Sequence, residues 1–284
     1  MIANVRRSHG MGMGGAMRAG VFAVLLMTGL AFSTASAWAQ DQETAPPVQI
    51  PAQGQAAPAP VDPKPADSKK AAEEAEDQAM LRVIGEGVQL MRSGQPRQAI
   101  AFFDQVIATY EVRYKDNPDR LYCGSSPAEI LAYMLLAASQ KPTKSAHAVP
   151  NTWGAAYFFK GFSLVELKDL DAAKASLERA RDLSPYNPHY LNELANIYKS
   201  EKNWPLALET YQAAKEHSAV FAQSKEKEEQ VALHGIAFIY SETGKLDEAE
   251  AIYKQCLAKN PQDAYAQHEL DYVTQQKAKQ AQVH

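Results

Sequence analysis

"LNELANIYKSEKNWPLALETYQAA", residues 191–214, is the stretch that decides the fold. Within it, Ala195 is followed twelve positions later by Ala207, and four positions after that by Tyr211. Small residues at this spacing let two antiparallel helices approach closely, and the large side chain fills the gap beside them. The stretch therefore predicts two antiparallel helices joined by a short turn.

The same twelve-and-four spacing recurs along the chain. The other three instances are Gly87, Ala99 and Phe103; Gly161, Ala173 and Leu177; and Ala237, Ala249 and Tyr253. Gly94 and Gly244 stand where two of the turns are expected, since glycine commonly ends a helix. Four copies of one helical hairpin predict a repeat array in which each copy packs mainly on its neighbours.

These copies resemble tetratricopeptide repeats, whose pattern runs W-x2-L-G-x2-Y, then A-x3-F, then P. The resemblance is clearest in residues 191–214 and in "LHGIAFIYSETGKLDEAEAIYKQCLAKNP", residues 233–261. The Trp position departs from the family pattern and holds Val83, Tyr157, Leu191 and Leu233. The resemblance implies an all-α solenoid of tetratricopeptide-type helical hairpins, with repeats near 80–113, 154–187, 188–221 and 230–263.

Uneven spacing of the copies predicts one long inserted segment, and about eight extra residues between the third copy and the fourth, since Ala195 and Ala237 are 42 residues apart. Gly87 and Gly161 are 74 residues apart, whereas Gly161 and Ala195 are 34 apart, the length of one such repeat. About 40 extra residues, the insert 114–153, therefore follow the first copy. After the last copy, residues 264–280 form an amphipathic pattern, and we expect a helix that caps the exposed end of the array.

The insert contains "RLYCGSSPAEIL", residues 120–131, in which Ser126 and Glu129 fit a capping box. In that motif the Ser126 hydroxyl accepts the Glu129 amide, and the Glu129 carboxylate accepts the Ser126 amide. We therefore expect a helix at 127–139. The whole chain after residue 68 is predicted to be helical, with no strands. The apolar side of the inserted helix is expected to pack on the rings of Phe158, Phe159 and Phe162.

The chain has two cysteines, and both fit structural roles better than catalysis. A nucleophilic Cys123 would need a base, and nothing in the spacing brings His147 to it. Cys256 falls where the neighbouring copies carry the small residues Ala180 and Ala214, which predicts a buried small side chain. Whether Cys123 and Cys256 form a disulfide stays open, because an exported location would permit one.

The N-terminal part has the layout of a secretory signal. Residues 1–39 combine three arginines, an uncharged apolar run and small residues at the end, which predicts a cleaved signal peptide. Residues 40–67 are rich in Pro, Ala and Gln and predict a disordered linker before the repeat domain, 68–284. We therefore expect export to the periplasm, with an uncleaved segment anchored in the inner membrane as the alternative.

Charge and composition exclude several other classes. Without residues 1–39 the chain keeps 26 basic residues (29 − 3) against 33 acidic ones, a net charge of about −7. No basic stripe for nucleic acid is visible, and the seven histidines show no metal-ligand spacing. No phosphate-binding loop lies outside the signal region. We therefore expect no cofactor, no metal, no nucleic acid and no small-molecule substrate.

The family resemblance also implies where a partner would bind. First helices of such repeats line a concave face, and this geometry places seven residues on it: Phe158, Phe162, Asn192, Asn196, Lys199, His234 and Phe238. The first copy has Ile84 and Val88 where family members that bind chaperone tails carry Lys and Asn, which argues against a carboxylate clamp.

The function predicted from these observations is a non-catalytic scaffold, exported to the cell envelope, that binds a protein or peptide in this groove. Two alternatives remain. One is an envelope hydrolase or thiol enzyme that uses the insert, and the other is a structural subunit of an envelope complex that acts through its convex surface.

Overall fold

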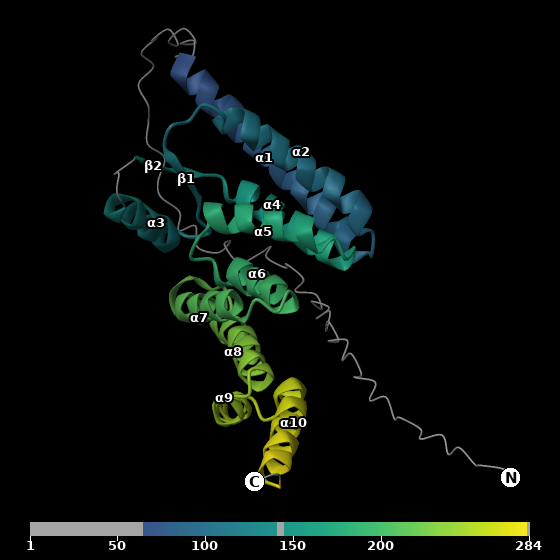
Figure 1. Cartoon of the computed structure of the whole chain (residues 1–284). Coiled ribbons are helices and arrows are strands. Elements are labelled where there is room, and N and C mark those ends of the chain that lie inside the picture. The colour runs from purple at the N-terminus through teal and green to yellow at the C-terminus, as the bar shows by residue number, and fades with distance from the viewer. Residues whose placement is uncertain (1–64, 141–144, 283–284) are drawn as a thin grey trace, which may run out of the picture. The chain divides into compact units, whose positions relative to one another are not determined.

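The structure, a computed structural model, describes residues 65–140 and 145–282 (Figure 1). The predicted signal peptide, 1–39, and the linker up to residue 64 lie outside the described residues. The first helix begins at Pro65, three residues before the predicted boundary at 68. Every helix in the described part of the chain is too short or too polar to cross a membrane.

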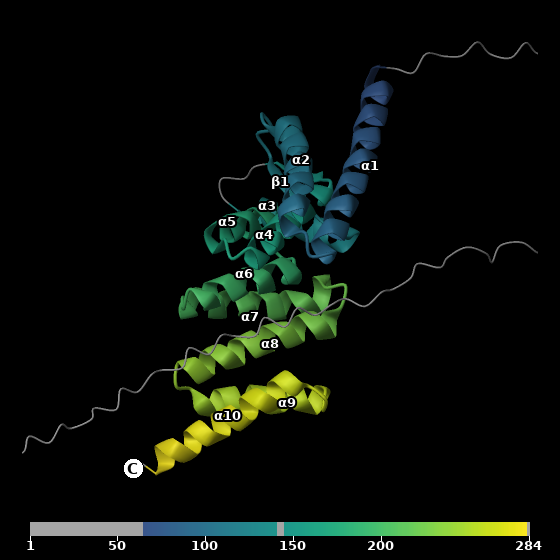
Figure 2. The same ribbon diagram turned by 90° about the vertical axis from the view of Figure 1, so that its right-hand side faces the viewer.

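Ten helices form the described domain, as predicted for an all-α fold. The first hairpin is α1 (Pro65–Arg92) with α2 (Pro96–Tyr114). Three further hairpins follow the insert: α4 (Asn151–Glu166) with α5 (Leu170–Leu183), α6 (Pro188–Ser200) with α7 (Trp204–Phe221), and α8 (Lys225–Glu242) with α9 (Leu246–Lys259). The last helix is α10 (Ala264–Ala281), where the cap was predicted. Each helix from α6 to α10 packs on the next, so that they lie in successive layers (Figure 2).

The core follows the repeated spacing. The second and third residues of each copy are buried: Ala99, Phe103, Ala173, Leu177, Ala207, Tyr211, Ala249 and Tyr253. A Cβ atom added at Gly161 would lie 2.7 Å from Leu177 Cγ, which is closer than real packing allows. The small residue is therefore what lets α4 and α5 approach, as the spacing predicts.

The turns between paired helices share a left-handed residue. Gly94 and Gly244 have φ values of +76° and +79°, as expected for glycine at these positions. At the equivalent turns of the second and third copies, Lys168 and Lys202 adopt φ values of +63° and +57°. The turn geometry is thus kept even where its usual residue is absent.

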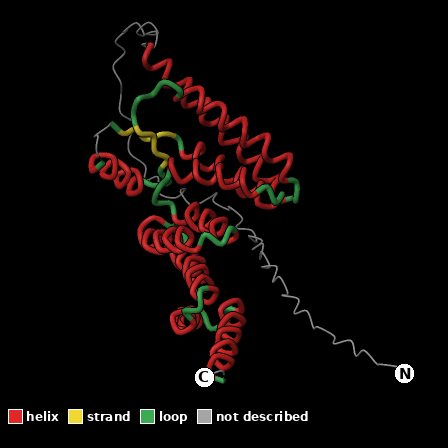
Figure 3. Tube along the Cα trace, in the orientation of Figure 1, coloured by secondary structure: helices red, strands yellow, loops and turns green. Residues whose placement is uncertain are grey.

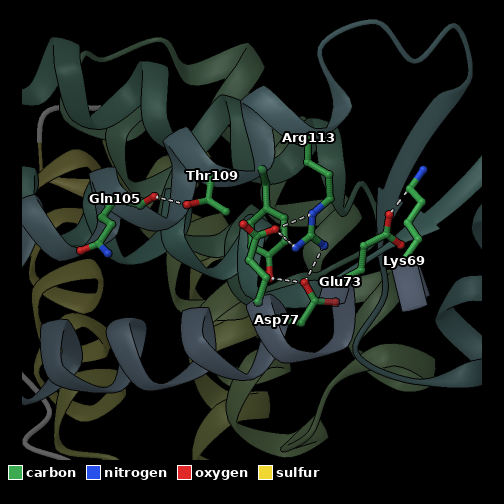
Figure 4. A network of polar contacts seen from close by, with 8 residues as sticks. Lys69, Glu73, Asp77, Gln105, Thr109 and Arg113 are labelled. Atoms are coloured by element: carbon green, nitrogen blue, oxygen red, sulfur yellow. Dashed lines mark hydrogen bonds and ion pairs between the residues drawn. The ribbon is translucent and has the colours of Figure 1, made fainter. Parts of the chain in front are cut away.

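The first hairpin is also joined by an ionic contact. The half-buried Arg113 of α2 reaches two carboxylates of α1: its Nη1 lies 2.6 Å from Asp77 Oδ1, and its Nε donates to Glu76 Oε2 at 3.0 Å (Figure 4). Tyr110 donates its hydroxyl to the same Asp77 oxygen at 3.1 Å. Because the guanidinium binds both acids at once, this cluster orients the long α1 on α2.

The prediction of a strand-free insert was wrong. Residues Arg120–Cys123 (β1) and Ala146–Val149 (β2) pair as parallel strands, in register from Arg120 with Ala146 to Cys123 with Val149 (Figure 3). The crossover between them contains α3, Pro127–Ser139, at the bounds expected for the inserted helix. Strands of four residues are too short to display a two-residue alternation, so the sequence carries no periodic signal for them.

The cap of α3 is confirmed in one half and corrected in the other. Ser126 Oγ accepts the Glu129 amide at 3.2 Å, as the capping box requires. The Glu129 carboxylate, however, accepts the Ser125 amide at 2.7 Å and the Ser125 hydroxyl at 2.5 Å rather than the Ser126 amide. Glu129 is also buried, and Tyr133 donates its hydroxyl to it.

The prediction that α3 packs on Phe158, Phe159 and Phe162 was also wrong. Its buried residues Tyr133 and Ala137 pack with Tyr122 of β1 and with Tyr186 of the α5–α6 turn. The Tyr133 ring lies 5.2 Å from that of Tyr122 and 5.5 Å from that of Tyr186. The inserted helix therefore extends the wall of the array beside its strands, and Leu131 and Leu135 remain 60% and 63% exposed on its outer side.

Candidate partner-binding face

The predicted binding residues come from the first helices α4, α6 and α8, which follow one another along the array (Figure 2). Spacings of three and four residues put the members of each helix on one side of it. We refer to the side of these helices that carries the seven predicted residues as the first-helix face. Some of its residues are fully buried in contacts between helices, and others remain partly accessible to solvent.

Phe158 belongs to the packing between α4 and α6. It is only 4% exposed, and its ring stacks on Tyr190 at 4.8 Å and meets His189 at 4.7 Å. Phe162, one turn further along α4, is half-buried, with its ring 6.5 Å from that of Phe158. Of the two aromatic residues, Phe162 is therefore the one that a partner reaches without disturbing the core.

Asn192 is buried and hydrogen-bonded within the protein. The residue is 1% exposed, and its Nδ2 donates to the Glu228 carbonyl at 3.1 Å and to the Glu228 carboxylate at 2.9 Å. Burial alone would raise the pKa of Glu228, but hydrogen bonds from His189 and Asn192 outweigh it and hold this pKa below its usual value. Asn192 thus fastens α6 to the start of α8, and binding through its amide would first have to break that link.

Asn196 and Lys199 are half-buried and lie one turn apart on α6. Asn196 Oδ1 accepts the Tyr211 hydroxyl at 2.6 Å. Lys199 Nζ lies 5.2 Å from the centre of the Phe238 ring, so the ammonium group and the ring form a cation–π contact between α6 and α8. Burial lowers the pKa of Lys199, although Glu193 and Glu269 oppose the shift. A poorly hydrated cation of this kind attracts a carboxylate more strongly than an exposed lysine does.

His234 and Phe238 continue the first-helix face on α8, and both are half-buried. His234 Nε2 lies 2.7 Å from Asp263 Oδ2, and its ring is 4.6 Å from that of Tyr265. Burial lowers the pKa of His234, and the nearby Asp263 only partly offsets that effect. At neutral pH the imidazole is therefore neutral.

Sequence reasoning missed Glu193 on this face. It is half-buried, and burial raises its pKa, while His189 and Lys199 act in the opposite direction. Helical spacing could have found it, because Glu193 precedes Asn196 by three positions. The first-helix face thus offers a carboxylate beside the amide and the ammonium group.

The cysteines show no sign of activation. Cys123 is buried, and its thiol donates to the Pro150 carbonyl at 3.3 Å. Burial raises the pKa of Cys123 to about 12 and that of Cys256 to about 11. Both therefore stay protonated at neutral pH, whereas nucleophilic attack needs a thiolate. His147 is exposed and lies 3.4 Å from Asp119.

The described cysteines also lie in different parts of the core. Cys123 belongs to the main cluster that runs from α1 to α8, and Cys256 belongs to the C-terminal cluster of α8, α9 and α10. Both are free thiols. Each fills space among apolar side chains, which is the common role of a buried cysteine.

Fold and face together define a helical-hairpin repeat protein with a partly open first-helix face. Family models described as tetratricopeptide repeat match residues 154–187 and 186–262. Residues 154–262 of this chain are therefore tetratricopeptide repeats. Proteins of this family are generally non-catalytic scaffolds for protein–protein interaction. Among curated proteins, none matches the chain.

Several solved structures are similar to this chain at low identity. A putative kinesin light chain repeat protein from Podosopora anserina is 15% identical over 72% of this chain and 90% of its own, with a TM-score of 0.48. The type IV pilus biogenesis factor PilW is 16% identical over 70% of each chain, with a TM-score of 0.48. The first repeat domain of Spaghetti (RPAP3), bound to an HSP90 peptide, is 22% identical over 44% of this chain and 93% of its own, with a TM-score of 0.39.

Proposed function

We propose that this protein is a non-catalytic scaffold that binds an extended segment of a partner protein across α4, α6 and α8. The observation that carries the proposal is the packing of the insert. Because α3 packs on Tyr122 and Tyr186, it does not cover the half-buried residues of the first-helix face. Those residues are Phe162, Asn196, Lys199, His234 and Phe238.

The chemistry of the face suits a segment that combines an acidic group with apolar side chains. Lys199 supplies a partly desolvated cation next to the Phe238 ring. The rings of Phe162 and Phe238 offer flat apolar surface for side chains of the partner. Asn196 carries an amide that can pair with a peptide backbone, which has both a donor and an acceptor in each residue.

The proposal includes export to the cell envelope. It rests on the signal layout of residues 1–39 and on the linker-like composition of residues 40–67. Fractionation followed by N-terminal sequencing tests it. We expect a mature, periplasmic chain that begins at Trp38 or Gln40, whereas an intact N-terminus in the membrane fraction would support the anchored form.

Site-specific crosslinking tests the binding face. A photoreactive residue at position 196 should capture a partner in the intact envelope, and a matched probe at the exposed position Val220 of α7 should not. Lys199→Ala should weaken the captured complex by about tenfold, since it removes the cation that meets the partner's acid. Capture from position 220 alone would contradict binding on the first-helix face and favour the convex-surface alternative.

A further inference from the structure

Three different metal-binding side chains meet at the C-terminal end of the array. His234 comes from α8, Cys256 from α9, and Asp263 from the turn before α10. One imidazole nitrogen, the thiol sulfur and one carboxylate oxygen all lie within 4.8 Å of one another. Cys256 and Asp263 are buried, and His234 is half-buried. They are far apart in the sequence, which is why histidine spacing alone predicted no metal site.

We propose that His234, Cys256 and Asp263 bind a divalent transition-metal ion of the zinc class. Nitrogen, thiolate sulfur and carboxylate oxygen are the three donor types that zinc accepts in proteins. A thiolate and an imidazole also disfavour calcium and magnesium, which take oxygen ligands. Three protein ligands leave a fourth position of a tetrahedral ion for water or another small ligand.

The ligand side chains would have to move by up to roughly 1 Å to surround a tetrahedral ion, since their ligand atoms are up to 4.8 Å apart. His234 Nε2 and Asp263 Oδ2 are 2.7 Å apart and share a hydrogen bond. Two such ligands on a tetrahedral zinc ion, each about 2.1 Å from the metal, lie roughly 3.4 Å apart. The hydrogen-bonded pair, now 2.7 Å apart, therefore needs to open by about 0.7 Å, with the metal replacing the shared proton.

The carboxylate of Asp263 can serve the fold and the ion at the same time. Its Oδ1 accepts the Ala266 amide at 3.0 Å and caps α10. Its Oδ2 faces His234, and Gln230 also donates to this oxygen, at 2.6 Å. Such an outer hydrogen bond orients a metal-binding carboxylate, as second partners do in known metal sites.

A groove borders Cys256 on the side of the second helices α7 and α9. Residues of α7, α8 and α9 line a groove of about 1100 Å³, and Gln230 and Cys256 are among them. Cys256 is 2% exposed beside this groove, so an ion would reach the thiol from this side when the surrounding side chains move aside.

The cluster is confined to the last copy. At the positions equivalent to His234, Cys256 and Asp263, the preceding copy has Asn192, Ala214 and Phe221. The repeat fold thus forms without these ligands, so their meeting in one copy is not a requirement of helix packing. An ion here would join α8, α9 and α10, and would stabilise the end of the array because it binds only the folded chain.

Cobalt binding to the full chain tests the proposal under reducing conditions. Cobalt(II) bound to a thiolate gives a charge-transfer absorption, which we expect at one ion per chain. Cys256→Ala should abolish this band and weaken zinc binding by about 100-fold, since losing an inner ligand costs at least as much as losing an outer partner. The variant should fold, because alanine is buried at the equivalent positions 180 and 214.

Two further variants make the outcome decisive. Cys123→Ala removes the other thiol and should leave the cobalt spectrum unchanged. Asp263→Asn keeps a residue that caps helices well but removes the carboxylate ligand, so zinc affinity should fall while α10 stays capped. A wild-type chain without a thiolate–cobalt band, or a band that survives Cys256→Ala, would overturn the proposal.

Discussion

The repeat hairpins and the insert of this protein are stabilised in opposite ways. The hairpin of α4 and α5 depends on apolar interdigitation, in which Gly161 makes room for the buried Leu177. The insert has a smaller core and instead buries the carboxylate of Glu129 among hydrogen-bond donors. The difference shows that a repeat array can accept a foreign segment if that segment satisfies its own polar groups.

Hydrogen bonds connect the two regions at the turn between α5 and α6. Ser184 donates its hydroxyl to the Cys123 carbonyl at 2.6 Å. The Tyr186 amide donates to the Tyr133 hydroxyl at 3.3 Å, and Tyr133 in turn donates to Glu129. The polar network of the insert therefore continues into the array, and Cys123 and Val149 of its strands also join the main apolar core.

The largest expected effect on stability comes from the apolar core of the repeat hairpins. Leu177→Ala should lower the free energy of unfolding by about 3 kcal/mol, because it removes buried methyl groups and leaves a cavity. Leu135→Ala on the outer side of α3 is the matched control, and since that leucine is 63% exposed, its effect should stay below about 0.5 kcal/mol. Urea denaturation followed by circular dichroism measures both.

Equal losses of unfolding free energy from the two leucine substitutions would contradict the difference between the buried Leu177 and the exposed Leu135. They would mean that the outer side of α3 is buried in solution, for example against another molecule. A concentration-dependent midpoint for the wild-type chain would then identify self-association as the cause.

The next effect concerns the buried carboxylate of the insert. Glu129→Ala should destabilise the insert by about 2 kcal/mol, since it leaves the Ser125 amide and the Tyr133 hydroxyl without their acceptor. Hydrogen exchange should therefore speed up at residues 120–139 and stay unchanged in α7 and α9. Faster exchange throughout the array would show that the insert is not a separate unit of stability.

Much of the fold could be predicted from the repeated spacing, because helix packing forces small and large residues to recur at fixed intervals. The bounds of α3 also followed from the sequence, since Ser126 and Pro127 are local start signals. The strands could not be predicted, because their pairing depends on two four-residue segments that are separated by the 22 residues 124–145.

The helices that carry the candidate binding residues could be predicted from the sequence, but the accessibility of those residues could not. Helical spacing places Asn192 and Asn196 on one side of α6, yet only the structure reveals that Glu228 of the next hairpin takes up the Asn192 amide. That contact depends on the position of the start of α8. The extra residues between the third copy and the fourth determine this position. Tertiary contacts of this kind leave no periodic signal in the sequence.

A smaller effect is expected at the cap of α3. Ser126→Ala should cost about 1 kcal/mol of stability in the insert, because the Glu129 amide loses its acceptor. Ser224→Ala is the control, since Ser224 precedes α8 without a side-chain capping bond. Hydrogen exchange of the first turn of each helix measures the difference, and similar changes in both helices would refute the capping role of Ser126.

The smallest expected effect lies in the turns, where the copies differ only in side chain. Lys168→Gly should stabilise the protein by about 0.5 kcal/mol, because relief of the left-handed strain, about 1 kcal/mol, exceeds the added entropy of the unfolded chain. Gly94→Ala should do the reverse and cost about 1 kcal/mol, although a Cβ there would meet nothing within 4 Å. Since space is available at Gly94, a loss in thermal denaturation would come from backbone conformation alone. No loss would mean that the turn relaxes, and the lysines at the equivalent positions would then carry no strain to relieve.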